Sequence, residues 1–354
     1  MKGRIIILGN GFDLAHGLKT SYKDLMEFLK SETDLERRNV GKCGTIHHQF
    51  KGKQNDYVSF KYVPNDREYK FTTCNKHKSF YFNKLFSDYN RYQKWVDLET
   101  LYFKLISSDN MSNQFIPTLN EEFDYLKLLL EDYLTNQIEN KISDYNFDRN
   151  SFFERDNIFE TIHPDTEKLI GIVNFNYTTS VVQSYTQFMY NKPKQLHNEF
   201  QNINVHGKLN SDENPIIFGY GDDNSEKYKS IQDVGNNELL VNFKTFQYLR
   251  NTNYKSVLSM LEMDTNIKIE IIGHSCGISD KTLLKTMFEH SHVKEIEYRY
   301  HTDEKYYFEN LYNISRIFSD NVMMRKKVKD LKSTRLIPQR KIVMINEDEL
   351  LNKL

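Results

Sequence analysis

Four short polar segments of this chain each follow an apolar run, and their residue types suit chemistry on a nucleotide. Glycine lets a backbone approach a phosphate closely, an asparagine amide orients water, and histidine accepts a proton near neutral pH. Each segment alone is also compatible with a plain turn or a core histidine, but their recurrence favours a shared site. The segments are Gly9-Asn10-Gly11, Asn174 to Thr178, His206-Gly207 and Gly273-His274-Ser275.

The first of these segments lies in the stretch from Arg4 to Asp24, RIIILGNGFDLAHGLKTSYKD. Its apolar run, residues 5–8, is typical of a strand buried on both faces of a parallel sheet. Ser21 followed by Asp24 indicates the N-cap of an amphipathic helix. A strand, a Gly-x-Gly turn and a helix can present N–H groups to a phosphate. The third glycine of the dinucleotide fingerprint is missing, so a purely geometric turn remains an alternative.

The elements that must position these segments alternate between strands and helices. Such alternation predicts an α/β fold with a doubly wound, mainly parallel, Rossmann-like sheet. Open sheets of this kind bind ligands at the carboxyl ends of their strands, where the four polar segments fall. The predicted strands cover residues 5–8, 169–173, 203–205, 215–218, 267–272, 296–300 and 342–345, with a helix capped by Ser279 or Asp280 and further helices near 304–330.

The region between the first two strands has a different character. We predict a nucleotide-binding core of residues 1–30 and 166–354, interrupted by an insertion over 31–165. The insertion opens with a polar excursion at 31–84, without a sustained period, and continues as helices at 85–107 and 117–134. Asp97 and Glu99 are expected on a solvated helix face.

Composition excludes several classes of function. The net charge of -1 with 27% charged residues provides no field that favours nucleic acid or a membrane surface. Three cysteines are too few for a disulfide framework, and an odd number of them cannot all pair within one chain. With no signal peptide and no long apolar run, we expect a soluble, cytoplasmic protein.

A zinc site in the polar excursion is the less favoured reading of its cysteines and histidines. Two cysteines and two histidines can hold zinc tetrahedrally, but the usual short spacing of the first pair is missing. We therefore expect no metal. The residues concerned are Cys43, His47, His48, Cys74 and His77.

Five stretches of the chain resemble a known family. GNGFDLAHGLKTSYKDL, WVDLE, VNFNYTTS, NVHGKLN and IIGHSCGISD are similar to motifs of AbiH-type bacteriophage abortive infection proteins, in blocks between about residues 4 and 285. The resemblance implies an anti-phage effector. The partners that we expect for it are NAD or a related nucleotide, a phage-derived trigger or partner protein, and a second copy of the chain in a homo-oligomer.

That family in turn resembles the sirtuin-like NAD-binding fold. Asn176 stands in the place of the catalytic asparagine of sirtuins, and His206 in the place of their catalytic histidine. The resemblance implies that NAD is the substrate and is hydrolysed, with Asn176 orienting water and His206 acting as general base. The implied NAD-binding residues are Gly9, Asn10, Gly11, Phe12, Asp13, Gly207, Gly273 and Ser275.

Two departures from the sirtuin pattern concern charge. Thr178 replaces an aspartate that helps to hold nicotinamide, and Asp13 places a carboxylate near the supposed pyrophosphate, which the N–H groups from Gly9 to Phe12 would bind. We expect Asp13 to cap the following helix or to meet a ribose hydroxyl.

Two alternatives of another class stay open. Gly273 to Gly277 matches the Gly-x-Ser-x-Gly nucleophile elbow of α/β-hydrolases, with Ser275 as nucleophile. The rest of that triad fits poorly, because no histidine follows His301. The second alternative is a nucleotide sensor without turnover.

Overall fold

The structure is a computed structural model that describes residues 2–28, 43–45, 58–63, 68–73, 81–87, 94–108, 112–144, 167–190, 200–223 and 225–339. The chain divides into two compact units, which are described separately. The first consists of Met1–Thr20, Leu134–Ile217 and Gln247–Leu354, and the second of Ser21–Tyr133 and Phe218–Phe246.

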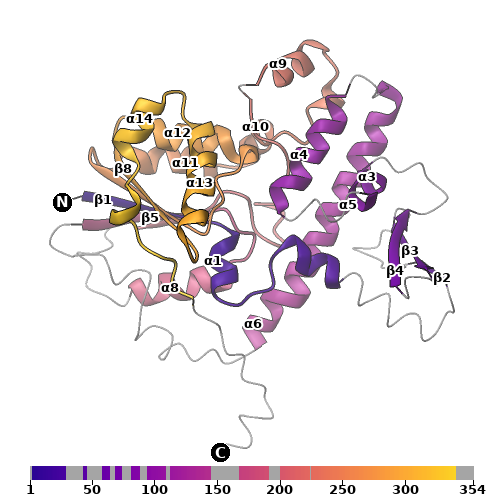
Figure 1. Cartoon of the computed structure of the whole chain (residues 1–354), viewed down its shortest axis with the longest axis horizontal. Coiled ribbons are helices and arrows are strands. Elements are labelled where there is room, and N and C mark those ends of the chain that lie inside the picture. The colour runs from indigo at the N-terminus through magenta and orange to yellow at the C-terminus, as the bar shows by residue number, and fades with distance from the viewer. Residues whose placement is uncertain are drawn as a thin grey trace, which may run out of the picture. The chain divides into compact units, whose positions relative to one another are not determined.

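The first unit contains a five-stranded sheet in which every neighbouring pair is parallel, in the order β6-β5-β1-β7-β8. Figure 1 labels β1, β5 and β8 of this sheet. This confirms the predicted α/β fold with a parallel sheet. Leu8 of β1 lies beside both Asn174 and Ile272, and Asn174 lies beside Asn204, so the four carboxyl ends share one edge. The strands are β1 (Lys2–Leu8), β5 (Glu167–Asn174), β6 (Gln201–Asn204), β7 (Ile267–Ile272) and β8 (Val293–Arg299).

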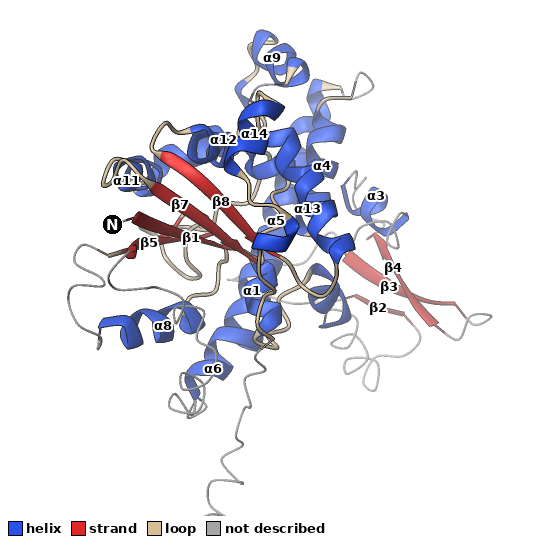
Figure 2. Cartoon of the chain, turned by 60° about the vertical axis from the view of Figure 1, so that its left-hand side comes forward, coloured by secondary structure: helices blue, strands red, loops and turns tan. Residues whose placement is uncertain are grey.

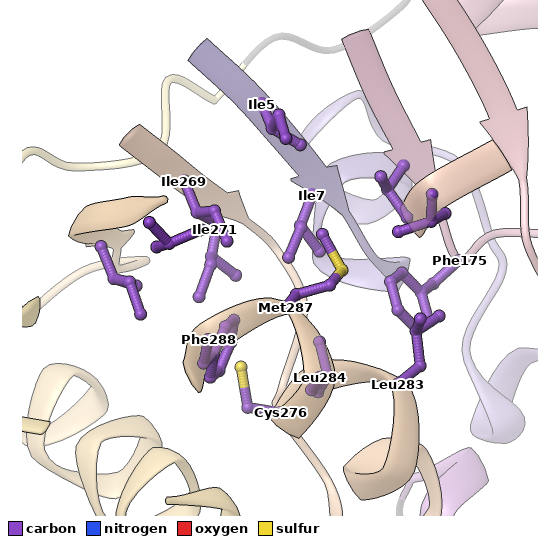
Figure 3. Packing of buried hydrophobic residues seen from close by; sticks show 14 of the residues in the cluster. Ile5, Ile7, Phe175, Ile269, Ile271, Cys276, Leu283, Leu284, Met287 and Phe288 are labelled. Atoms are coloured by element: carbon purple, nitrogen blue, oxygen red, sulfur yellow. The ribbon is translucent and has the colours of Figure 1, made fainter. Parts of the chain in front are cut away.

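Helices cover both faces of this sheet (Figure 2). On one face, Leu283 and Met287 of α12 pack towards Ile7 and Ile271 of the sheet, all fully buried (Figure 3). The apolar isoleucine runs form strands because both faces of each strand are covered. The helices of the first unit are α1 (Asn10–Ala15), α6 (Asn140–Asp144), α8 (Ser180–Tyr190), α11 (Asn253–Leu261), α12 (Lys281–Glu289), α13 (Glu304–Ile317) and α14 (Asn321–Lys327).

The alternate residues of β1, β7 and β8 carry a buried network of charges. The Glu270 carboxylate accepts hydrogen bonds from Arg4 and Arg335, and it pairs with Arg299. Glu297 lies 2.6 Å from the ammonium of Lys268. Burial opposes ionisation of Glu297, but the hydrogen bonds from Arg335 and Lys268 outweigh it and lower its pKa to about 2. This side of the sheet is therefore held by ion pairs.

The second unit is built around helices and a separate antiparallel sheet. The predicted capping box is confirmed, since Ser21 N–H donates to Asp24 Oδ2 at the start of a helix over 22–28. Its other helices are α3 (Tyr81–Ser87), α4 (Trp95–Ile106), α5 (Ile116–Leu134), α9 (Glu226–Asp233) and α10 (Lys244–Gln247), and its strands, in the order β2-β3-β4, are β2 (Cys43–Thr45), β3 (Val58–Val63) and β4 (Glu68–Thr73).

Several predicted elements need correction. The polar excursion contains the three strands β2 to β4, and the helix predicted over 85–107 is replaced by α3 and α4. Glu99 is buried instead of solvated, because its carboxylate pairs with Lys244 at 2.9 Å and accepts the N–H of Gly219. Residues 215–218 form no strand, since their backbone makes single bonds such as Ile217 N–H to His206 O. The predicted strand at 342–345 lies outside the described residues.

Among the described residues, no helix is both long and apolar enough to cross a lipid bilayer.

Candidate active site

The loops that follow β1 and β7 are in direct backbone contact. Gly11 N–H donates to Gly273 O at 2.8 Å, and Gly9 N–H donates to Ile272 O at 3.1 Å. A Cβ added to Gly9 would lie 2.5 Å from the Cα of His274, and one on Gly11 would lie 2.8 Å from the Cα of Gly273. Gly273 itself has φ +72°, in the left-handed region. Close packing of the two loops thus explains these three glycines.

The same contacts affect the predicted pyrophosphate site. The N–H groups of Gly9, Gly11 and Phe12 all donate to backbone carbonyls in this structure. A short helix, α1, begins at Asn10 directly after the strand, ahead of the longer helix predicted from Ser21. The binding of pyrophosphate by residues 9–12 therefore stays a prediction, and it requires a rearrangement of these hydrogen bonds.

Asp13 of α1 is a buried carboxyl group with two side-chain partners. Its Oδ2 accepts from the Thr178 hydroxyl and its Oδ1 accepts from Asn176 Nδ2 at 3.1 Å. Burial raises its pKa from 3.8 to about 7, with a further rise from Glu139, while the hydrogen bonds from Thr178 and Asn176 oppose the rise. Thr178 and Asp13, the two departures from the sirtuin pattern, are thus each other's partners.

Asn176 ties the end of β5 to the glycine loop. Its Nδ2 lies 3.1 Å from Gly9 O as well as from Asp13, and its own N–H donates to Asn174 Oδ1. Asn174 in turn donates to Asn204 Oδ1 on the neighbouring strand β6. Within the described part of the chain, Asn176 Oδ1 accepts no hydrogen bond. The donor side of this amide is structural, and its oxygen can still bind a ligand.

His206 follows β6 and is buried in an aromatic and acidic environment. Its Nε2 lies 3.1 Å from Asp280 Oδ1 and 3.4 Å from the Tyr248 hydroxyl. The tight turn after it requires Gly207, which has φ +84° and whose added Cβ would lie 2.1 Å from Pro215 O. A carboxylate beside an imidazole orients the ring and stabilises its protonated form. The geometry therefore suits His206 for general base catalysis.

Asp280 also faces a second histidine. Its Oδ2 lies 3.5 Å from His274 Nε2, and His274 Nδ1 accepts the N–H of Cys276 at 3.0 Å. That backbone bond leaves the proton of a neutral His274 on Nε2, which points to Asp280. Asp280 occupies the N-cap position of α12 but makes no capping hydrogen bond. The Ser279 hydroxyl has no hydrogen-bond partner among the described residues, so the predicted cap by Ser279 or Asp280 is wrong. The sequence did not predict that Asp280 faces the two histidines. The only indication in the sequence was an acidic residue shortly after the histidine that follows a strand.

The His206–Asp280 pair spans the sheet edge. His206 follows β6 and Asp280 precedes α12, although β5 and β1 lie between β6 and β7 in the sheet. The ring of Phe175, after β5, contacts both imidazoles, with centroids 5.0 Å from His206 and 4.3 Å from His274. The residues after three different strands therefore meet at the carboxyl edge.

Ser275 lacks the geometry of a hydrolase nucleophile. The left-handed residue of the motif is Cys276, with φ 50°, whereas a nucleophile elbow places the strain at the serine. No imidazole or carboxylate of the described residues hydrogen-bonds to the Ser275 hydroxyl. Cys276 is fully buried, and burial raises the pKa of its thiol, so it is unreactive.

The structure does not test the zinc site that the sequence analysis considered. His47, His48, Cys74 and His77 lie outside the described residues, and only the backbone of Cys43 is described, in β2.

Comparison with known families gives a match over residues 5–302 to the family described as bacteriophage abortive infection AbiH. The chain belongs to the AbiH family. No curated protein and no solved structure matched the chain. In this AbiH protein the first motif has an internal structural role, because its polar side chains bind one another and a neighbouring helix. The Thr20 hydroxyl donates to Asn10 Oδ1 at 2.6 Å, and His16 Nε2 lies 2.9 Å from the Tyr185 hydroxyl of α8.

Proposed function

We propose that this AbiH protein acts in phage defence by binding NAD at the carboxyl edge of the sheet and hydrolysing it to nicotinamide and ADP-ribose. The observation that carries the proposal is the buried pair of His206 and Asp280, together with Asn176, which follows the strand adjacent to that of His206. The strand order reverses between β1 and β7, and open α/β sheets bind ligands outside the carboxyl ends at such a point.

In the proposed reaction, the bond between ribose C1′ and the nicotinamide nitrogen breaks and water adds to C1′. The electron pair of that bond leaves with nicotinamide, which becomes neutral. Asn176 Oδ1 orients the water, and His206 accepts its proton. Asp280 stabilises the imidazolium that forms. Because the transition state is an oxocarbenium-like ribose, positioning and electrostatics supply most of the rate enhancement.

The sirtuin-like fold is part of the same proposal. In this proposal the loop from Gly9 to Asp13 binds the two phosphates of NAD. The loop that contains Gly273 and Ser275 binds its adenosine. A carboxyl group with a pKa of about 7 is neutral in a large share of molecules at neutral pH, so Asp13 repels a pyrophosphate less than an ordinary carboxylate would.

The test measures NAD binding and nicotinamide release separately, with purified protein and with cells sampled after phage challenge, because a toxic activity has to be latent. Asn176→Ala and His206→Ala should each lower release by about 10²–10⁴-fold. His301→Ala, which removes an exposed histidine whose Nε2 lies 3.1 Å from Gln339 Oε1, is the matched control. Binding without release in either setting would support the sensor alternative. Absence of binding by the wild type would refute the proposal.

A further inference from the structure

We propose that Glu262, His290 and His292 form a binding site for a divalent transition-metal ion of the Zn²⁺ type. The three residues lie in the first unit, at the amino end of the parallel strands. Glu262 is the C-cap residue of α11, His290 is the C-cap residue of α12, and His292 directly precedes β8. The candidate active site is at the carboxyl end of the same strands, so this would be a second, separate site.

The spacing of the three side chains fits metal coordination. One ligand atom from each residue lies within 4.8 Å of the other two. His290 Nε2 is 3.1 Å from Glu262 Oε1, and His292 Nδ1 is 3.4 Å from Glu262 Oε2. Ligands about 2.0–2.1 Å from a tetrahedral zinc ion lie roughly 3.3 Å from one another. Small side-chain rotations therefore suffice to bring the three ligand atoms to one ion.

The backbone that carries the two histidines is fixed by hydrogen bonds. Val293 N–H donates to His290 O at 3.1 Å, and Ile267 N–H of β7 donates to His292 O at 2.8 Å. His292 Nδ1 also lies 3.1 Å from Leu261 O. This nitrogen is also the one that faces Glu262, so a bound ion would replace the proton shared with Leu261 O. His290 Nδ1 accepts the N–H of His292, which orients the His290 ring with its Nε2 towards Glu262. These hydrogen bonds therefore order the loop before a metal ion binds.

The charges around the site are compatible with a cation. Two lysines are close, but their ammonium groups bind backbone carbonyls: Lys327 donates to Phe288 O and His290 O, and Lys294 donates to Ser291 O. Neither binds a ligand atom. The Glu262 side chain is 64% exposed, so an ion can enter from solution and keep water as a fourth ligand. Two imidazoles and one carboxylate suit zinc-type ions better than Ca²⁺ or Mg²⁺, which prefer oxygen ligands.

A metal ion at this site would connect three elements of the first unit. An ion held by α11, α12 and the start of β8 binds the folded state alone, so it stabilises that state by mass action. We therefore expect the melting temperature of the metal-free protein to rise when Zn²⁺ is added.

The experiment is calorimetric titration of metal-free full-length protein with Zn²⁺, and absorption spectroscopy with Co²⁺. His290→Ala, His292→Ala and Glu262→Gln should each weaken binding by about tenfold or more, since even outer-shell changes cost 10–100-fold. His301→Ala should bind like the wild type. Co²⁺ should give visible d–d bands without the near-ultraviolet thiolate band that a cysteine site would produce. Binding unchanged in both histidine variants, a thiolate band that accounts for all bound Co²⁺, or no binding by the wild type would overturn the proposal.

Discussion

Asp13→Asn tests whether the buried carboxyl group at the sheet edge is held in its neutral form. The native protein raises the pKa of Asp13 from 3.8 to about 7, mainly by burial. The folded state therefore binds a proton more tightly than the unfolded state between these two pH values. The stability that this proton contributes to the folded state is fully present below about pH 4 and is lost as the pH rises to about 7. Above that pH the folded protein must carry a buried carboxylate.

The size of the effect follows from the pKa difference. At 1.36 kcal/mol per pKa unit, a rise from 3.8 to about 7 costs the native state about 4 kcal/mol at high pH. More than half of this accumulates between pH 5 and pH 8. Asparagine cannot ionise, and its amide can replace both contacts of Asp13, by accepting from Asn176 and donating to the Thr178 hydroxyl oxygen. The variant should therefore gain stability relative to the wild type as the pH rises.

Hydrogen exchange of the amides of β1 and β5 is the suitable measurement, because the chain has two compact units and these strands report on the first alone. Asp303→Asn, which removes an exposed helix-capping carboxylate of the same unit, controls for the loss of one negative charge. If the difference between Asp13→Asn and the wild type is the same at pH 5 and pH 8, Asp13 does not titrate in this range and the reasoning is refuted.

Three further predictions concern other residues. Glu270→Ala should destabilise the first unit by about 3–5 kcal/mol, because Arg4 and Arg299 lose a shared buried partner; slower exchange or no change at β7 amides would contradict this. Asp280→Asn should lower nicotinamide release by about 10²-fold or more while NAD binding persists, whereas parallel losses of both would indicate a merely structural role. Ser275→Ala should weaken NAD binding and leave some turnover, and covalent labelling of Ser275 by a fluorophosphonate would instead favour the hydrolase.

Patterns set by nearby residues predicted the structure well. The capping box of Ser21 and Asp24 depends on residues three apart, and the isoleucine runs of β1 and β7 depend on burial of both strand faces. The parallel order followed from the alternation of strands and helices. Residues 215–218 show the limit of such patterns, because a short apolar run can pack without joining a ladder.

The candidate site could be predicted only in part. In a parallel sheet the carboxyl ends of neighbouring strands lie at one edge. The strand register confirms this for the strands that precede residues 9, 176, 206 and 273. The pairing of His206 with Asp280 could not be foreseen, because it joins segments whose strands are not neighbours in the sheet. Glu99 was misjudged because its partner Lys244 is distant in sequence.

The contact between the loops after β1 and β7 has a consequence for how this sequence can diverge. At Gly9 and Gly11 a single added methyl group would collide with backbone atoms of the opposite loop, which no side-chain rotation can relieve. A substitution there is accommodated only when the segment around Gly273 changes its path at the same time. We therefore expect substitutions at positions 9, 11 and 273 to occur together across the AbiH family, so that the two loops evolve as one unit.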